Sequence, residues 1–265
     1  MKGAGIDMWK DLYAYRELLK TSVQKELRGK YKASFLGILW SYINPLLQIL
    51  VYAIVFPYLM RGNTGDNYLI YICAGVIPWI FFSSVLTTCV SIIRGNSNLI
   101  KKVYFPRVIL PISVSISAFI NFLISCCIIL VFAIFQGVGI SWHIVFVPLI
   151  GCIQLVFSLG IGLVLSAADV YAQDLQYIIT FVLNLAFYGS PIVYQINMFS
   201  TTSFLMTAIK INPITMFLEC YRDAFLYHIC PSLNTVVVLL IEAMGVFYIG
   251  YYIFKKLEKG FAEEL

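Results

Sequence analysis

Long uncharged runs of apolar residues alternate with short basic segments along this chain. Residues 67–93 and 108–168 contain no Asp, Glu, Lys or Arg. A helix of about 20 apolar residues is long enough to cross a bilayer. The pattern therefore predicts an all-α integral membrane protein with six transmembrane helices, at residues 36–60, 68–93, 108–135, 144–167, 176–196 and 234–254. A glycine-rich turn at 136–139 divides the third helix from the fourth.

Three regions follow from this pattern. Residues 1–33 form an interfacial amphipathic segment, 34–254 the six-helix transmembrane domain and 255–265 a tail. Between Met8 and Leu27 an apolar residue recurs every three or four positions, with basic residues opposite, which is typical of a helix lying in the membrane interface. The first apolar run begins only after Lys32, so we expect no cleavable signal.

The distribution of charge orients the chain. Of the 18 Lys and Arg residues, 15 fall on the side that holds both termini. The positive-inside rule therefore predicts cytoplasmic N- and C-termini in a multi-pass protein. Only 12% of the residues are charged, about half the share of a typical soluble domain. The net charge of +5 does not indicate nucleic-acid binding, because the basic residues flank apolar runs instead of forming a patch on a soluble fold.

A basic island at residues 94–107 separates the second and third predicted helices. Leu99, Ile100, Val103 and Tyr104 would share one face of a short helix that ends near Phe105, because Pro106 disfavours helical geometry there. The island is either a plug that docks on a partner protein or a loop that only sets the topology. Its candidate contact residues are Leu99, Ile100, Lys101, Lys102, Val103, Tyr104, Phe105, Pro106 and Arg107.

A second amphipathic or re-entrant helix is predicted on the outer side, after Asn212-Pro213. Glu219, Arg222 and Asp223 would occupy its polar face. The helix either caps the bundle or gates an exit. Cys220 and Cys230 share this outer segment and could form a disulfide in an oxidising compartment.

The sequence contains few of the motifs that are typical of catalytic or nucleotide-binding sites. The sequence lacks a phosphate-binding loop of the Gly-x-x-x-x-Gly-Lys type, and its two histidines are too few for a zinc centre. Glu242 interrupts the sixth helix, where it either lines a polar path or makes a packing contact. Aromatic rings could likewise line a path for sugars or pack in the core. The residues considered for a path are Trp40, Tyr42, Trp79, Phe181, Tyr188, Tyr194 and Glu242.

Several stretches, taken together, are specific. Residues 28–47 (RGKYKASFLGILWSYINPLL), 74–82 (AGVIPWIFF) and 98–111 (NLIKKVYFPRVILP) are followed by Asp174–Tyr177, Tyr188–Tyr194 and 212–223. In order and spacing they resemble permease subunits of type-2 ABC exporters for polysaccharides and teichoic acids, the Wzm and TagG/TarG group. One departure is Gln173, because relatives often carry Arg before the acid that stands here as Asp174.

The resemblance implies a homodimer in the bacterial inner or cytoplasmic membrane, energised by a separate ABC ATPase chain in two copies that binds ATP and Mg. It implies that residues 97–107 form the coupling helix and that the N-terminal amphipathic helix lies beside it. The cargo would be an undecaprenyl-type lipid-linked glycan or a polyol-phosphate polymer, and a basic rim of Arg28, Lys30 and Lys32 would attract its phosphate. This chain itself would bind no cofactor and no metal and would not be an enzyme.

Two alternatives remain at this point. One is a type-2 ABC permease for another cargo, such as a drug or a lipid. The other is a membrane-embedded glycan transferase, which would need a cluster of polar catalytic groups.

Overall fold

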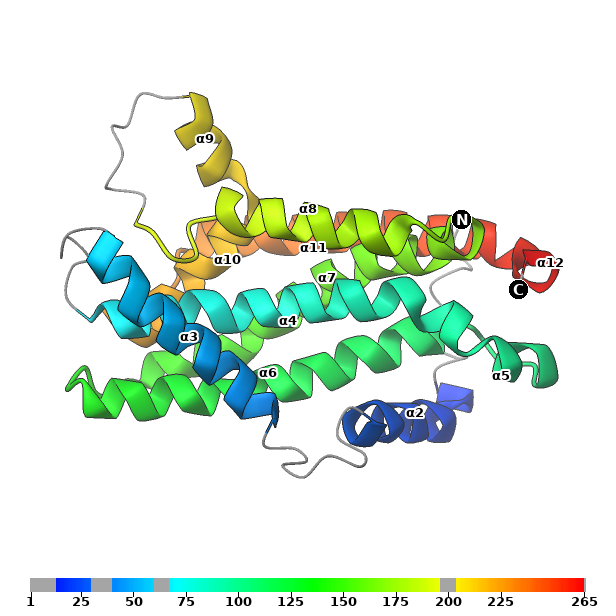
Figure 1. Ribbon diagram of the computed structural model, residues 1–265, viewed down its shortest axis with the longest axis horizontal. Helices are drawn as coiled ribbons and strands as arrows, with labels where there is room; N and C mark the ends of the chain where they lie inside the picture. The colour runs from blue at the N-terminus through cyan, green and yellow to red at the C-terminus, as the bar shows by residue number, and fades with distance from the viewer. Residues whose placement is uncertain (1–12, 30–39, 60–66, 196–203, 265) are drawn as a thin grey trace.

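The computed structural model describes residues 13–29, 40–59, 67–195 and 204–264 (Figure 1). Within these ranges all regular secondary structure is helical, as the sequence predicts. The α-helices are α2 Arg16–Gly29, α3 Trp40–Leu59, α4 Tyr68–Gly95, α5 Ser97–Lys102, α6 Ile109–Phe135, α7 Phe146–Tyr171, α8 Leu175–Gly189, α9 Phe204–Ile211, α10 Pro213–Arg222, α11 Leu233–Leu257 and α12 Phe261–Glu264. Short turns of helix also occur at Trp142–Val145, Asp223–Tyr227 and Glu258–Gly260.

Four helical segments of the described chain are long and apolar enough to cross a membrane: Tyr68–Gly95, Ile109–Phe135, Trp142–Tyr171 and Leu233–Gly260. Two shorter apolar helices, Ile43–Tyr58 and Leu175–Gly189, accompany them. The protein is therefore an all-helical integral membrane protein. The turn predicted at 136–139 is present, and Gly137 and Gly139 both adopt positive φ there (74° and 79°), a conformation that costs glycine little.

The fifth predicted helix ends earlier than expected. α8 stops at Gly189, whereas the apolar run suggested a helix to residue 196. The carbonyl groups of Pro191 and Ile192 accept hydrogen bonds from Arg222 instead of continuing the helix. The sequence does not reveal this turn, because the residues that form it are buried and mostly apolar, as those of a membrane helix would be.

The long helices α4, α6, α7, α8 and α11 run roughly side by side, and α3 crosses them obliquely (Figure 1). α4 lies at the centre, and every residue from Ile70 to Trp79 is buried. A helix that is apolar on all sides is expected in the interior of a bundle. α5 and α12 lie together at one end of the molecule, and α2 lies against α6.

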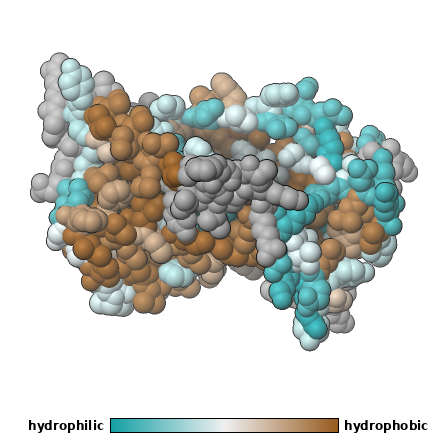
Figure 2. Space-filling model, turned by 60° about the horizontal axis from the view of Figure 1, so that its bottom comes forward, coloured by the Kyte–Doolittle hydropathy of each residue, from teal (hydrophilic) through white to brown (hydrophobic). Residues whose placement is uncertain are grey.

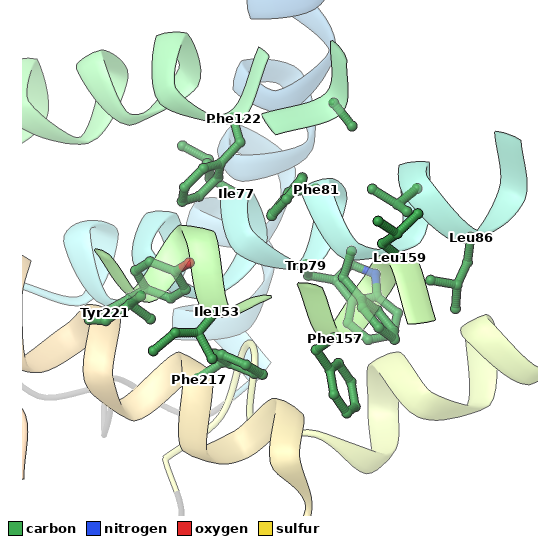
Figure 3. Close-up of a cluster of buried hydrophobic side chains, with 14 of the residues drawn as sticks. Ile77, Trp79, Phe81, Leu86, Phe122, Ile153, Phe157, Leu159, Phe217 and Tyr221 are labelled. Atoms are coloured by element: carbon green, nitrogen blue, oxygen red, sulfur yellow. The ribbon is translucent and has the colours of Figure 1, made fainter. Parts of the chain in front are cut away.

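Aromatic rings fill the space between α4 and its neighbours (Figure 3). The ring of Phe81 in α4 stacks on Phe122 of α6, with centroids 5.0 Å apart. Phe157 of α7 lies 5.8 Å from Phe217 of α10. A polar contact accompanies them, because the Tyr221 hydroxyl donates to Gln154 Oε1 over 2.7 Å. Gln154 Nε2 in turn donates to the carbonyl oxygen of Pro78, 3.0 Å away. These contacts attach α10 to the centre of the bundle.

α7 and α11 approach each other most closely at two glycines. A Cβ added at Gly160 would lie 2.6 Å from the backbone nitrogen of Phe247, and one added at Gly250 would lie 2.8 Å from the carbonyl carbon of Gly160. Small residues at helix contacts allow backbones to pack closely in a bilayer, where the hydrophobic effect does not drive association.

Candidate functional site

The loop that follows α4 is the best candidate site for a partner. α5 ends at Lys102, and Val103 is already extended (φ −132°, ψ 133°). The prediction of a helix reaching Phe105 with Val103 and Tyr104 on its apolar face is therefore wrong. Tyr104 is 93% exposed, whereas Phe105 is only 5% exposed. Extended backbone alternates side chains between opposite faces, so Tyr104 projects outward while Phe105 is an anchor in the core.

Leu99 and Ile100 are half-buried on the inner side of α5, and Lys101 and Lys102 are exposed. The predicted division of these four residues into an apolar and a basic face therefore agrees with their burial. Residues 100–105 and Arg107 line a shallow depression of 240 Å³. A basic surface with one protruding aromatic ring and an adjoining hollow suits contact with another protein.

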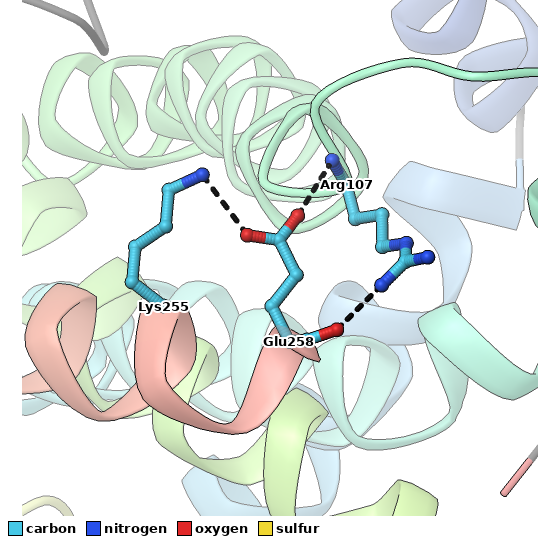
Figure 4. A network of polar contacts seen from close by, with 3 residues as sticks. All are labelled: Arg107, Lys255 and Glu258. Atoms are coloured by element: carbon cyan, nitrogen blue, oxygen red, sulfur yellow. Dashed lines mark hydrogen bonds and ion pairs between the residues drawn. The ribbon is translucent and has the colours of Figure 1, made fainter. Parts of the chain in front are cut away.

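The end of the loop is fastened to the C-terminal part of the chain (Figure 4). The Arg107 guanidinium donates to the backbone carbonyl of Glu258 over 2.5 Å, and the Arg107 backbone N–H donates to Glu258 Oε1 over 3.3 Å. Glu258 Oε2 pairs with Lys255 Nζ at 2.9 Å. The guanidinium of Arg107 also lies 5.6 Å from the centre of the Phe261 ring, which is fully buried. The loop and the end of α11 are thus tied together.

The beginning of the loop has its own attachments. Arg94, in the last turn of α4, donates to the carbonyl oxygen of Asp169 and pairs with its carboxylate at 3.4 Å. Lys25 of α2 donates to Asn96 Oδ1 over 3.1 Å, so α2 reaches the start of α5. The sequence singled out neither Glu258 nor Asp169 as an anchor. Asp174 is exposed at the start of α8, beyond the buried Asp169.

The outer segment is arranged differently from the prediction. α10 begins at Pro213 as expected, and Asn212 caps it by accepting from the backbone N–H of Ile214 over 3.0 Å. Glu219 is exposed and Asp223 half-buried, but Arg222 is only 3% exposed. The placement of Arg222 on an exposed polar face is therefore wrong. Its amino group Nη2 donates to the carbonyls of Pro191 (2.6 Å) and Ile192 (3.0 Å), and its guanidinium stacks 3.6 Å from the centre of the Tyr71 ring.

Two tyrosines also bond residues 191–194. We call their bonds, together with those of Arg222, the Arg222 clasp. The Tyr68 hydroxyl donates to the Val193 carbonyl over 2.5 Å, and the Tyr71 hydroxyl donates to that of Tyr194 over 2.8 Å. Four side-chain hydrogen bonds from α4 and α10 therefore hold the chain after α8. Buried Lys and Arg side chains are rare unless they have partners. The partners of Arg222 are two carbonyl oxygens and the Tyr71 ring instead of a carboxylate. Cys220 is buried, Cys230 is exposed, and neither forms a disulfide.

The sequence matches the ABC-2 type transporter family over residues 17–226. The chain belongs to this family. It is 33% identical over 260 residues to the O-antigen export system permease protein RfbA of Myxococcus xanthus, covering 98% of this chain and all of the relative. An RfbA protein of Klebsiella pneumoniae is 32% identical over 254 residues, 94% of this chain and 95% of the relative. The polysialic acid transport protein KpsM of Escherichia coli is 25% identical over 218 residues, 78% of this chain and 82% of the relative.

In this ABC-2 transporter the aromatic residues considered for a path are divided between the core and the surface. Trp79 is buried against Phe82 and Phe187, with ring centroids 5.7 Å away in both cases, so it packs in the core of this copy. Phe181 and Tyr188 are exposed on α8. The Tyr194 hydroxyl donates to the Tyr188 carbonyl over 3.2 Å.

The remaining candidates of this ABC-2 transporter are placed as follows. Trp40 stands at the start of α3 on the rim of a cavity. Glu242 is half-buried in α11, and its Oε2 atom is buried without a hydrogen-bond partner among the described residues. Arg28 and Tyr42 belong to α2 and α3 by their backbones. Lys30 and Lys32 lie outside the described residues.

The surface of the ABC-2 transporter changes character along its length (Figure 2). Hydrophobic residues gather over one half of the visible face, and hydrophilic residues gather at the end that carries α5 and α12. Exposed apolar side chains of α3 such as Leu47, Leu50 and Ile54 contribute to the hydrophobic half. The hydrophobic half suits contact with lipid, and the hydrophilic end suits contact with water.

Proposed function

We propose that this chain is the membrane-spanning subunit of an ATP-driven exporter that moves a lipid-linked polysaccharide, such as O-antigen or wall teichoic acid, to the outer face of the bacterial cell membrane. The names of the relatives favour an O-antigen or a related polysaccharide. The observation that carries the proposal is the loop at 101–104: it is basic, it projects Tyr104 into solvent, and it is fixed at both ends to the bundle. An energy-coupling contact requires such a combination of exposure and firm attachment.

The energy would come from a separate ABC ATPase, two copies of which bind ATP and Mg and contact two copies of this chain. α3 and α8 would complete six spans with the four long helices, and both termini would be cytoplasmic. α8 has 15 residues and is about 22 Å long, shorter than the roughly 30 Å hydrocarbon core. The non-helical residues after it would cover the remaining depth, supported by the Arg222 clasp, in keeping with the rule that irregular backbone in a bilayer is buried in protein.

The contacts suggest how force would travel. Movement of an ATPase surface would push on Lys101, Lys102 and Tyr104. Because Arg107 is bonded to Glu258, the push would reach α11 as well as α6. The acids and Arg222 of the outer segment would then act at the exit, where the clasp fixes α8 to α4 and α10. Phosphate on the cargo would first meet the basic residues Arg28, Lys30 and Lys32 on the cytoplasmic side.

The test compares Tyr104→Ala with Tyr58→Ala. Both residues are strongly exposed, at 93% and 87%, but Tyr58 lies at the far end of α3. Truncation of an aromatic hot spot costs about 2 kcal/mol or more, so Tyr104→Ala should weaken capture of the ATPase by about thirtyfold and abolish export. Tyr58→Ala should change neither. Phe105→Ala is unsuitable, because removing this buried ring would cost about 3–5 kcal/mol of stability.

The proposal fails if the Tyr104→Ala protein binds the ATPase and supports export as the wild type does. Glycan transfer by the purified chain without any ATPase would instead establish an enzyme.

A further inference from the structure

A cavity of 590 Å³ opens between α3, α4 and α6, apart from the loop and the outer clasp. Trp40, Asn44 and Pro45 of α3 form one wall. The other walls come from the middle of α4 and of α6, through Ile77, Ile80, Phe81, Ser84, Ala118, Asn121, Phe122 and Ser125. Sites for small ligands typically have volumes of about 300–1,000 Å³ and combine apolar walls with a few polar groups. The cavity has the size and composition of such a site.

The cavity lies about midway along α6. Asn121 is 12 residues from the first residue of α6 and 14 from the last, so it lies about 18 Å and about 21 Å from the two ends at 1.5 Å per residue. At this depth the bilayer supplies no hydrogen bonds, and an unpaired polar group costs free energy. Polar side chains that line the cavity therefore need partners.

Three of them have none within the described chain. The amides of Asn44 and Asn121 and the hydroxyl of Ser125 make no side-chain hydrogen bond to any described residue. Other buried serines behave differently: Ser113, Ser115, Ser117, Ser158 and Ser166 each donate to a carbonyl three or four residues earlier. Ser125 thus leaves its hydroxyl available on the cavity side of α6, one turn from Asn121.

The lining also defines the kind of ligand. Neutral amides and hydroxyls can both donate and accept, as the hydroxyl groups of a sugar do. Phe81 and Phe122 border the cavity, but they are only 2% exposed and stack on each other, so Trp40, which is 37% exposed, is the most open ring of the lining. An indole ring of this kind suits the face of a sugar ring. No Lys or Arg lines the cavity among the described residues, so a phosphate would find no charge partner.

A second hollow lies along α3. It has a volume of 620 Å³ and an almost wholly apolar lining, formed by Ile43, Leu46, Leu47, Ile49, Leu50, Ala53 and Ile54 with Leu69 of α4 and Phe132 of α6. The same three helices build both hollows, and the residue numbers on α6 and α4 show that the second lies nearer the end where α3 finishes. A hydrocarbon chain could occupy it while a polar group sits at Asn121.

We propose that the α3–α4–α6 cavity binds a neutral sugar ring attached to a hydrocarbon chain, with the ring at Asn44, Asn121 and Ser125 and the chain along α3. The inference goes beyond the proposed function, since the neutral glycolipid that this site would take lacks the phosphate of the proposed cargo.

The experiment uses the full chain in phosphatidylcholine nanodiscs that contain a small fraction of monoglucosyl diacylglycerol, with diacylglycerol and phosphatidylglycerol as comparison lipids. The lipid that copurifies after exchange is quantified by mass spectrometry. We expect the wild type to enrich the glucolipid over both comparison lipids. Asn121→Leu combined with Ser125→Ala should reduce this enrichment about tenfold, which corresponds to 1.4 kcal/mol.

Gln48→Leu is the matched control. It removes an amide one turn from Asn44 on the same helix. Gln48, however, bonds Tyr52 and lines neither hollow. The Gln48→Leu protein should therefore enrich the glucolipid as much as the wild type does. If the double variant fails to fold, Asn44→Ala replaces it, because this exposed side chain supports no packing and its loss should still lower enrichment. Equal enrichment in the wild type and these variants, or no preference for the glucolipid, overturns the proposal.

Capture of the ATPase by the same preparations separates the two conclusions. Capture without glucolipid enrichment refutes the cavity as a sugar site and leaves the proposed function standing. Enrichment without capture refutes the proposed function and keeps the site. Disulfide cross-linking of two copies of Asn44→Cys, together with loss of the glucolipid, would show that a second copy fills the cavity and would also overturn the proposal.

Discussion

The close crossing of α7 and α11 leads to a sharp prediction about stability. In Gly250→Ala the new Cβ would lie 2.8 Å from the carbonyl carbon of Gly160, and closer still to its oxygen. Carbon atoms in contact are about 3.5–4.0 Å apart, so the two backbones would have to separate by about 1 Å. Backbone atoms cannot rotate away as a flexible side chain can. Overpacking of this kind costs about 1–3 kcal/mol.

Gly245→Ala isolates this steric cost. Gly245 lies in the same helix, but an added Cβ there would meet nothing within 4 Å. Both substitutions gain the helical preference of alanine over glycine, about 1 kcal/mol. The difference between the two variants is therefore the steric cost alone, about 1–3 kcal/mol.

Thermal unfolding in nanodiscs measures that difference. A change of 1 kcal/mol shifts the midpoint by about 2–4 °C for a chain of this size. We expect Gly250→Ala to unfold at least this much below Gly245→Ala, with Gly245→Ala at or above the wild type. If the two variants unfold together, α7 and α11 do not pack through Gly160 and Gly250.

Three further predictions use the same assay. Arg222→Leu should destabilise the protein by about 1–3 kcal/mol for each of the two buried carbonyls, those of Pro191 and Ile192, that would lose their donor; an unchanged midpoint would contradict the clasp. Tyr71→Phe should cost only about 1 kcal/mol, since it removes one hydrogen bond but keeps the ring under Arg222. Burial, and then the charge of Glu219, raises the pKa of Asp223 above its ordinary 3.8. The folded state therefore favours the protonated acid, and this contribution is full below pH 3.8 and is lost as the pH rises through the raised pKa. Asp223→Asn should gain stability relative to the wild type between about pH 4 and pH 7, and a constant difference would refute it.

Much of the helical framework could be predicted from the sequence. Uninterrupted apolar runs located α4, α6, α7 and α11 to within a few residues, because a membrane helix must be apolar over its whole length. The same criterion failed at the end of α8. Residues after Gly189 are as apolar as the helix, and only distant partners such as Arg222 provide the hydrogen bonds that let the chain turn.

The candidate site was predicted in part. Charge and spacing indicated the exposed lysines of the loop, but helical periodicity placed Tyr104 on an apolar helix face, whereas the helix ends at Lys102 and Tyr104 is exposed. The extended conformation of Val103 reverses which side chain faces the core, so that Phe105 is buried and Tyr104 is exposed. Arg222 was misplaced for a similar reason. A charged residue on an amphipathic helix normally faces water, and no local signal reveals that Tyr71 and two carbonyls receive it.

The seating of Phe261 affects how the protein should be handled in the laboratory. Its ring is fully buried beside Tyr171 and Phe254 and beneath Arg107. A truncation before Phe261 would remove its contact with Arg107 in the loop that follows α5, although every long helix would remain. Purification tags and fluorescent fusions that disturb this short C-terminal turn would therefore be expected to give a well-inserted protein in which the loop after α5 is displaced.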